Sequence, residues 1–319
     1  AAMLNHMAVI RHGTNDLKEA RTLAERAVAL VQGASSSAAT SSSSSAAEEA
    51  NYRETLAAIQ FSMGDRAAAA RAYESILALP LHQRDLAAYK RNYAWQLKVE
   101  GRLEESRTLL LSAVDGLAQS DKPLDPIRID AIKTLGIIEQ ELGHFDAATT
   151  RLTEATHLAE QAVNSGFARV DLYVQCTMSL ANCAADAAYL NLDAQALSTA
   201  RSMLEATLAA QGDVANPISD VLEARVLLLE ARNAEAYLAA ARAVQRLEGV
   251  DVSAIDPSFK AQAASVLGEA CLKTARVERA RELLPSAAAE IARLRGESHL
   301  RTRQARDRVQ QLERIGPAR

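Results

Sequence analysis

Aromatic residues are scarce in this chain: they make up 4% of its 319 residues, with one tryptophan and four phenylalanines. Alternation of Val, Ile, Thr or Tyr with polar residues, which is typical of strands, is also scarce. No apolar run approaches the roughly 18–20 residues of a membrane-spanning helix. The first residues, Ala1–His6, lack the charged end and apolar centre of a signal peptide. These absences argue against sheets, membrane spans and a secretory leader.

Charge and cysteine content restrict the compartment and the partners. The formal net charge of -4 favours neither a nucleic-acid-binding protein nor one with an acidic tail. The three cysteines, Cys176, Cys183 and Cys271, show no paired spacing. We expect buried free thiols in a reducing compartment, and therefore a cytoplasmic location; a disulfide is the alternative.

What the chain does contain is a helix-turn-helix pattern that recurs, most clearly over 135–155 and 267–287. Small residues recur at fixed positions, which allows two antiparallel helices to pack closely, and larger residues fill the space between pairs. The first copy reads Leu135, Gly136, Gly143, Phe145, Ala148, Leu152 and Ala155; the second reads Leu267, Gly268, Val277, Ala280, Leu284 and Ala287.

This pattern resembles the tetratricopeptide repeat (TPR). The resemblance implies an all-α fold: a right-handed superhelical α-solenoid of stacked antiparallel helix pairs with a concave binding face. The spacing of 42 residues from Ser106 to Ala148 exceeds the usual period near 34. That longer spacing, and the single Gly-x-x-His-x-x-Thr sequence at 296–302, are similar to the kinesin-light-chain type of repeat.

We predict one array over 1–319 that begins inside a repeat, which suggests a fragment of a longer chain. A mobile Ser-rich loop follows the first, partial repeat. Asp125-Pro126, Asn216-Pro217 and Asp256-Pro257 each predict a capped helix start with proline at the first helical position. The predicted parts are a partial repeat 1–32, the loop 33–47, repeats 48–84, 85–120, 125–162, 168–212, 216–249 and 256–295, and a capping helix 297–315.

Enzyme motifs are missing from the sequence, including the phosphate-binding loop, the nucleophile elbow and the His-Glu-x-x-His zinc helix. Glu139, Glu141, His144 and Asp146 cluster around one turn and are the candidate metal ligands. Because Gly143 marks a turn between helices, we interpret them as solvated polar residues instead. We therefore predict no enzyme activity, no cofactor and no metal.

The resemblance to TPR proteins implies that ligands contact the first helix of each pair. Counting back from the turn glycines Gly64, Gly101 and Gly143 selects one face of each such helix. Trp95 is an aromatic anchor between basic residues and favours an acidic or C-terminal peptide segment; the alternative is that it fills a gap between pairs. The predicted peptide-binding residues are Phe61, Arg91, Trp95, Lys98, Lys133, Ile137 and Gln140.

Two other binding modes are disfavoured. Trp95 stands where the two-carboxylate clamp of some TPR proteins needs Asn, and Thr134 where it needs a basic or amide side chain. Eight arginines lie between Arg293 and Arg319, but no aromatic residues are interleaved to stack on bases. We interpret Arg301, Glu313 and their neighbours as the polar outer face of the capping helix, so nucleic acid is an unlikely partner.

The sequence therefore predicts a non-catalytic scaffold or adaptor that binds a peptide or protein segment in its concave groove. One alternative is the sensor or substrate-recruiting region of a larger bacterial signalling protein, either a kinase or a transcription regulator. A second is a self-assembling structural array, in which the chain forms homo-oligomers. Nothing in the sequence identifies the partner or points to a membrane.

Overall fold

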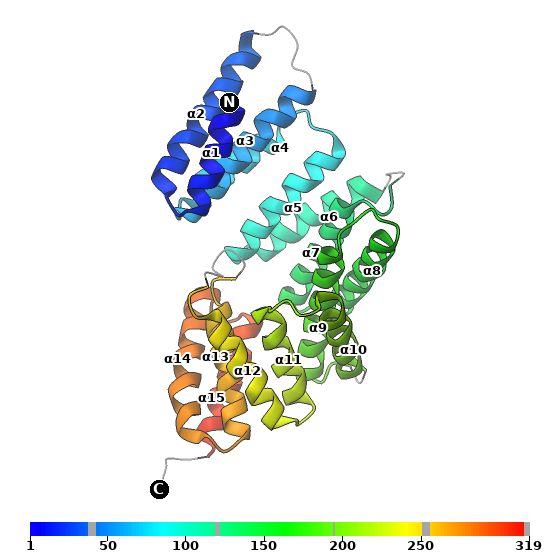
Figure 1. The fold of residues 1–319 in the computed structure, drawn as a ribbon, viewed down its shortest axis with the longest axis vertical. Helices are drawn as coiled ribbons and strands as arrows, with labels where there is room; N and C mark the ends of the chain where they lie inside the picture. Colours follow the sequence, from blue (N-terminus) through cyan, green and yellow to red (C-terminus); the bar gives the residue numbers. More distant parts are fainter. Residues whose placement is uncertain (38–42, 119–121, 194, 251–255, 316–319) are drawn as a thin grey trace. The chain divides into compact units, whose positions relative to one another are not determined.

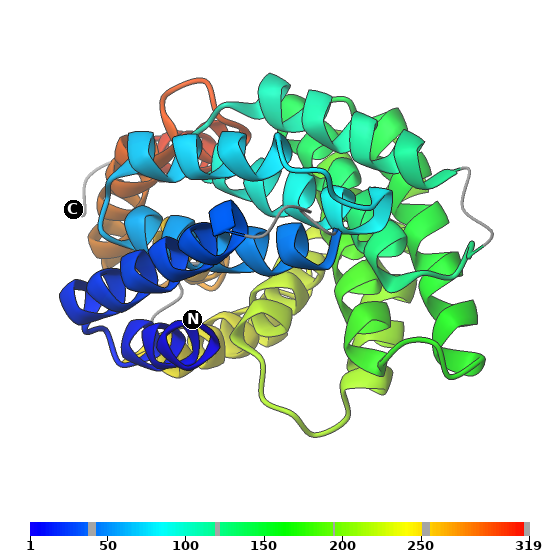
Figure 2. The ribbon, with the colours of Figure 1, turned by 90° about the horizontal axis from the view of Figure 1, so that it is seen from above.

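The computed structural model describes residues 1–37, 43–118, 122–193, 195–250 and 256–315. Fifteen α-helices, and no strand, occupy these described ranges, which confirms the all-α prediction (Figure 1). In the same ranges, no helix is both long enough and apolar enough to cross a membrane. The helices pack as consecutive pairs joined by short turns, as Figure 2 shows for the first two.

The chain divides into two compact units, of which unit 1 spans Ala1–Pro123. Its helices form three pairs, and each pair buries small residues such as Ala20, Ala69 and Ala113 along its contact. The bounds are α1 (Ala2–Gly13), α2 (Leu17–Ser37), α3 (Ser43–Ser62), α4 (Arg66–Leu77), α5 (Gln83–Val99) and α6 (Leu103–Ala118).

Unit 2 spans Leu124–Arg319 and contains four pairs and one further helix, α15. The first helices of successive pairs also contact one another, α7 with α9, α9 with α11, α11 with α13, and α13 with α15. The bounds are α7 (Pro126–Leu142), α8 (Phe145–Asn164), α9 (Val170–Tyr189), α10 (Ala196–Gln211), α11 (Pro217–Leu229), α12 (Asn233–Leu247), α13 (Phe259–Lys273), α14 (Val277–Arg295) and α15 (Leu300–Glu313).

One turn geometry joins the two helices of each of the seven pairs in the described residues. The first or second residue after the helix has positive φ, and the next backbone N–H bonds to a carbonyl five residues earlier, as from His144 to Glu139 at 2.8 Å. This left-handed turn is a common helix C-cap. The residues with positive φ are Asn15, Gly64, Gly101, Gly143, Asn191, Ala231 and Ala275.

Two glycines sit where helices approach most closely. A Cβ at Gly136 would lie 2.7 Å from Leu152 Cγ, and one at Gly268 would lie 2.7 Å from Leu284 Cγ. These separations are well below normal carbon contacts, so the leucine of the second helix packs directly on the glycine backbone of the first. The predicted role of Gly136 as a close-approach residue is confirmed.

Some predicted boundaries need correction. The Ser-rich segment 33–47 is not a loop throughout, because α2 runs to Ser37 and α3 begins at Ser43; residues 38–42 lie outside the described part. The alanines of this segment favour helix, and serine is tolerated there. The predicted partial repeat 1–32, with a short first helix and a second helix from Leu17, corresponds to α1 and the longer α2.

Two of the three predicted proline-led helix starts are confirmed. Asp125 and Asn216 accept hydrogen bonds from the backbone N–H two residues later, and proline opens each helix. The third is wrong by two residues: Asp256 accepts bonds from Ser258, and α13 begins at Phe259. The aspartate there caps a turn that precedes the helix.

Replacing Gly136 with alanine is expected to destabilise unit 2. The added methyl group would force Leu152 away from α7, at a cost of about 1–3 kcal/mol in the free energy of unfolding. The control is Gly33→Ala in α2, where nothing lies within 4 Å of the new Cβ. In this control, the better helix propensity of alanine should raise the free energy of unfolding by about 0.5–1 kcal/mol. Chemical denaturation measures the free energy of unfolding of both variants. If both substitutions changed it equally, the close contact between Gly136 and Leu152 would be contradicted.

Ala231 occupies a left-handed turn position that L-residues adopt with strain. We expect Ala231→Gly to raise the free energy of unfolding by about 0.5–1 kcal/mol, because glycine adopts this φ freely. The matched control, Ala209→Gly on the exposed side of α10, should lower it by about 1 kcal/mol. Thermal melts of the two variants should therefore shift in opposite directions.

Candidate functional site

Helices α3 and α5 of unit 1 carry four of the predicted binding residues. Arg91, Trp95 and Lys98 lie on α5, and Phe61 lies on α3. Trp95 is half-buried, and the Lys98 ammonium lies 4.6 Å from the centroid of its ring. The Arg66 guanidinium lies 3.7 Å from the Phe61 ring centroid. Both aromatic rings thus have a cation on one face.

A hydrogen bond joins the sides of α3 and α5 that carry these aromatic residues. Asn92 donates to Glu54 Oε1. Glu54 lies two helical turns before Phe61, and Asn92 lies one turn before Trp95, so each pair shares a helix side. Burial raises the pKa of Glu54, against the opposing effects of the Asn92 hydrogen bond and the Arg91 charge. We name Phe61, Arg91, Trp95 and Lys98 the aromatic face.

The other three predicted residues lie on α7 in unit 2, where their side chains contact neighbouring residues of the same unit. Lys133 is 8% exposed, pairs with Asp130 at 2.5 Å and donates to Gln175 Oε1 at 2.7 Å. Ile137 packs against the cluster that contains Leu152. Gln140 is 3% exposed and is bonded within the unit. These side chains contribute to the interior of unit 2.

The partner of Gln140 is Asp186 on α9, a residue that sequence analysis missed. The Asp186 side chain is fully buried, and four side chains from three other helices donate to it. Gln140 Nε2 donates to Oδ2 at 2.6 Å, Arg225 of α11 donates to Oδ1, and Arg301 and Gln304 of α15 donate to Oδ1 at 2.5 and 2.9 Å.

Opposing effects determine the charge of this buried carboxylate. Burial by itself would raise the pKa of Asp186, but the charges of Arg301 and Arg225 and the hydrogen bonds of Gln304 and Arg301 outweigh it and lower the pKa to about 2. Burial lowers the pKa of Arg225 to about 10, well above neutrality. At neutral pH, Asp186 is therefore an ionised carboxylate held between guanidinium groups.

The predicted outer polar face of the last helix is wrong at Arg301. This side chain turns inward to Asp186, and Arg308, which is 6% exposed, donates to Glu269 Oε2 of α13 at 2.5 Å and to Ser265 Oγ at 3.2 Å. Glu313 is exposed as expected. The inward arginines have buried carboxylate partners, which the sequence of the helix alone does not reveal.

A signal in the sequence could have found some of these residues. Trp95 and Ile137 stand six residues before the turn residues Gly101 and Gly143. Arg225 and Glu269 stand six residues before Ala231 and Ala275, which take the same left-handed turn. The prediction counted back from glycines only, so it omitted pairs whose turn residue is alanine or asparagine.

Three of the candidate metal ligands, Glu139, Glu141 and His144, make contacts with other side chains. Glu139 is buried, not solvated as expected, and its Oε2 lies 2.7 Å from His144 Nδ1. Glu141 lies 3.6 Å from His299 of α15. Within the described residues, no group of three or more His, Cys, Asp or Glu side chains is arranged to hold a metal ion.

The cysteines are buried free thiols, as predicted. Burial raises the pKa of Cys176 and of Cys183 to about 12. At neutral pH these two side chains are protonated and pack as small apolar groups, which disfavours nucleophilic chemistry at either sulfur.

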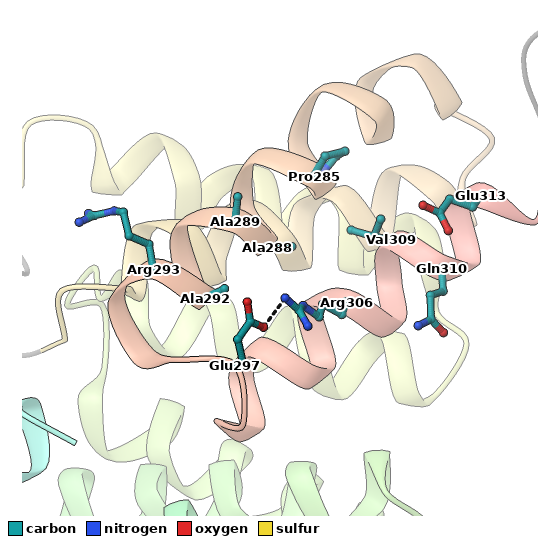
Figure 3. A pocket seen from close by; sticks show the side chains of 10 residues that line it. All are labelled: Pro285, Ala288, Ala289, Ala292, Arg293, Glu297, Arg306, Val309, Gln310 and Glu313. Atoms are coloured by element: carbon teal, nitrogen blue, oxygen red, sulfur yellow. Dashed lines mark ion pairs between the residues drawn. The ribbon is translucent and has the colours of Figure 1, made fainter. Parts of the chain in front are cut away.

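An open hollow of about 700 Å³ lies between α14 and α15 (Figure 3). Ala288, Ala292 and Val309 line it with apolar surface. At its rim Glu297 pairs with Arg306, while Arg293 pairs with Glu290 at 2.6 Å. These charges compensate one another, so the hollow lacks the convergent polar groups of a small-molecule site.

No family model and no curated protein matches the sequence. Among solved structures, the chain is similar to the Rap conjugation gene regulator of the plasmid pLS20 in complex with the Phr* peptide, with a TM-score of 0.52 and 16% identity over 88% of this chain and 79% of that one. It is similar to a Rap protein complexed with competence and sporulation factor, with a TM-score of 0.51 and 12% identity over 98% and 96%. It is also similar to BtubC (BKLC) from P. vanneervenii, with a TM-score of 0.51 and 15% identity over 88% and 92%.

These likenesses and the helix pairs define the class of this protein: it has the fold of the TPR-type helical-repeat arrays. Identities of 12–16% show the fold alone. The kinesin-light-chain-like subtype, the division into repeats and the cytoplasmic location stay predictions.

Replacing Asp186 with asparagine is expected to destabilise unit 2 by about 3–5 kcal/mol at pH 7, because it leaves the buried guanidinium groups without their anion. The native pKa lies below the ordinary value of 3.8, so Asp186 stabilises the fold above about pH 4 and loses that effect as the pH falls toward 2. Urea denaturation of the wild type and the variant at several pH values measures the free energy of unfolding and its pH dependence.

The difference in the free energy of unfolding between the wild type and Asp186→Asn should accordingly become smaller below about pH 4. The control is Glu105→Gln, which removes the exposed ion pair with Arg102. Its effect at pH 7 should be far smaller, because exposed pairs are screened by water. A similar loss in both variants would contradict the central role of the buried carboxylate.

Proposed function

We propose that this protein is a non-catalytic interaction scaffold whose aromatic face binds a peptide or protein segment. The observation that carries the proposal is the half-buried Trp95, with Lys98 against its ring and Arg91 one turn earlier. A partly exposed tryptophan between cations supplies apolar contact area and attracts negative charge, and tryptophan and arginine are enriched among residues that dominate binding energy. The expected ligand is an acidic or C-terminal segment.

The proposal depends on α3 and α5 rather than on α7. The predicted binding residues Lys133 and Gln140 already bond within unit 2, and the partly buried Ile137 packs against a core cluster there. A ligand would have to break buried hydrogen bonds to reach them. A ligand could contact the half-buried Trp95 of the aromatic face without breaking a buried hydrogen bond of that side chain.

Two of the similar solved structures support a peptide ligand. One is a Rap regulator in complex with the Phr* peptide, and the other is a Rap protein complexed with competence and sporulation factor. The second candidate function is a sensor region of a larger bacterial signalling protein. Kinase or DNA-binding motifs in the same gene would support that candidate, and a gene that encodes the array alone would count against it.

Trp95 makes the proposal directly testable, because it is the only tryptophan and therefore reports binding by its own fluorescence. Peptides selected from a random library on the wild-type chain should quench or shift this emission. We expect the selected peptides to be acidic and to bind Arg91→Glu at least about tenfold more weakly, a loss of about 1.4 kcal/mol.

The matched control is Arg71→Glu, which makes the same charge change on the exposed side of α4. This variant should bind the selected peptides as the wild type does. Binding that survives in a folded Trp95→Ala variant, measured by calorimetry, would move the site away from the aromatic face.

A further inference from the structure

Within each unit, the first helix of a pair packs on the second helix of the preceding pair through one side, which we name the stacking face. It consists of the residues that stand 12, 8 and 5 places before the turn residue with positive φ. Spacings of four and three residues keep these side chains on one side of a helix. In α3 the stacking face is Tyr52, Leu56 and Ile59.

Contacts in both units show what covers the stacking face. Ile59 of α3 belongs to a buried cluster with Ala20 and Ala24 of α2. The Tyr93 ring of α5 stacks on the Tyr73 ring of α4, with 5.0 Å between the centroids. The corresponding residues of unit 2 belong to clusters with α8, α10 and α12; they are Cys183 in α9, Val226 in α11 and Leu267 in α13. At each of these contacts a neighbouring helix buries the stacking face.

The stacking face of α1 is apolar and exposed. Counting back from Asn15 selects Met3, Met7 and Ile10, whose exposed fractions are 73%, 39% and 51%. The residue of α3 that corresponds to Ile10 is Ile59, which is fully buried. Helix α1 thus has the apolar stripe of a packed helix, and this stripe faces solvent, as is typical of an interaction surface.

Charge distinguishes this face from the exposed side of the last helix. Arg11 is the only Lys, Arg, Asp or Glu in α1, and its guanidinium pairs with Glu19 of α2 at 3.0 Å. The exposed residues of α15 are all polar: Arg303, Arg306, Asp307, Gln310 and Glu313. A head-to-tail contact between α15 of one copy and α1 of the next would bury these charges against apolar side chains. Two copies of the α1 stacking face can instead meet without charge repulsion.

We propose that the stacking face of α1 is the interface of a two-fold symmetric dimer of this chain. In such an interface the same patch of both copies meets, so a residue at the symmetry axis lies against its own copy. Met7 takes this place because it stands between Met3 and Ile10 in the stripe. An antiparallel arrangement of the two α1 helices brings opposite ends of their dipoles together. Methionine suits the contact because its unbranched side chain fills irregular gaps.

The size of the contact determines the expected strength of the dimer. Helix α1 has 12 residues and a length of about 18 Å. An interface between two such helices is small, so we expect a reversible dimer rather than an obligate one. A two-fold contact closes after two copies, whereas a head-to-tail contact would extend the array. This inference uses only α1 and is independent of the peptide-binding proposal.

Sedimentation of the full chain over a concentration series tests the proposal. We expect the wild type to dimerise and Met7→Glu to raise the dissociation constant of the dimer at least about tenfold, because like charges then meet at the axis. Met7 is partly exposed, so this variant should keep its fold, which circular dichroism checks. A wild type that stays monomeric up to about 100 µM would overturn the proposal.

The matched control is Leu238→Glu on α12, which makes the same kind of change at a residue that is 63% exposed. This variant should dimerise as the wild type does. If it lost dimerisation to the same extent as Met7→Glu, the effect would come from added charge in general and not from the stacking face of α1.

Mixing two variants tests the two-fold symmetry itself. Met7→Glu and Met7→Lys should each be mainly monomeric, but their mixture should form a heterodimer because opposite charges then meet at the axis. A fluorescent label on one variant detects this complex by sedimentation. If the mixture does not associate, or if Met7→Glu alone dimerises as the wild type does, the two copies do not meet at Met7 and the proposal is wrong.

Discussion

One buried carboxylate, Asp186, connects four helices of unit 2. It lies on α9 and receives hydrogen bonds from Gln140 of α7, Arg225 of α11 and Arg301 and Gln304 of α15. An unpaired buried charge costs far more than a paired one, so arrangements that separate these helices are penalised. The position of α15 depends on this constraint together with the apolar packing of Ala305, Val309 and Leu312.

The feature that the helix pairs share is the backbone geometry of their turns. All seven described pairs use the left-handed turn residue and the same backbone hydrogen bond, although glycine fills that position in three pairs only. Asparagine tolerates this conformation, and the two alanines adopt it with strain that the surrounding helices offset. The repeat is consequently regular in the fold and irregular in the sequence.

The two units present surfaces of different chemistry. The aromatic face of unit 1 combines the partly exposed Trp95 and Phe61 with cations, of which Lys98 is itself buried. In unit 2, the buried carboxylates of Asp186 and Glu269 pair with Arg301 and Arg308 of α15.

The sequence by itself determined the helices, their pairing, the close approach at Gly136 and the capped starts at Asp125 and Asn216, because these depend on local periodicity, residue size and capping. It also assigned Trp95 to the ligand-binding face of α5, which stays a prediction. Only the tertiary structure decided that Lys133 and Gln140 are engaged, that Glu139 is buried and that Arg301 points inward. Arg301 and Asp186 are 115 residues apart, and helical periodicity indicates which side of a helix a residue occupies but not which distant helix meets it.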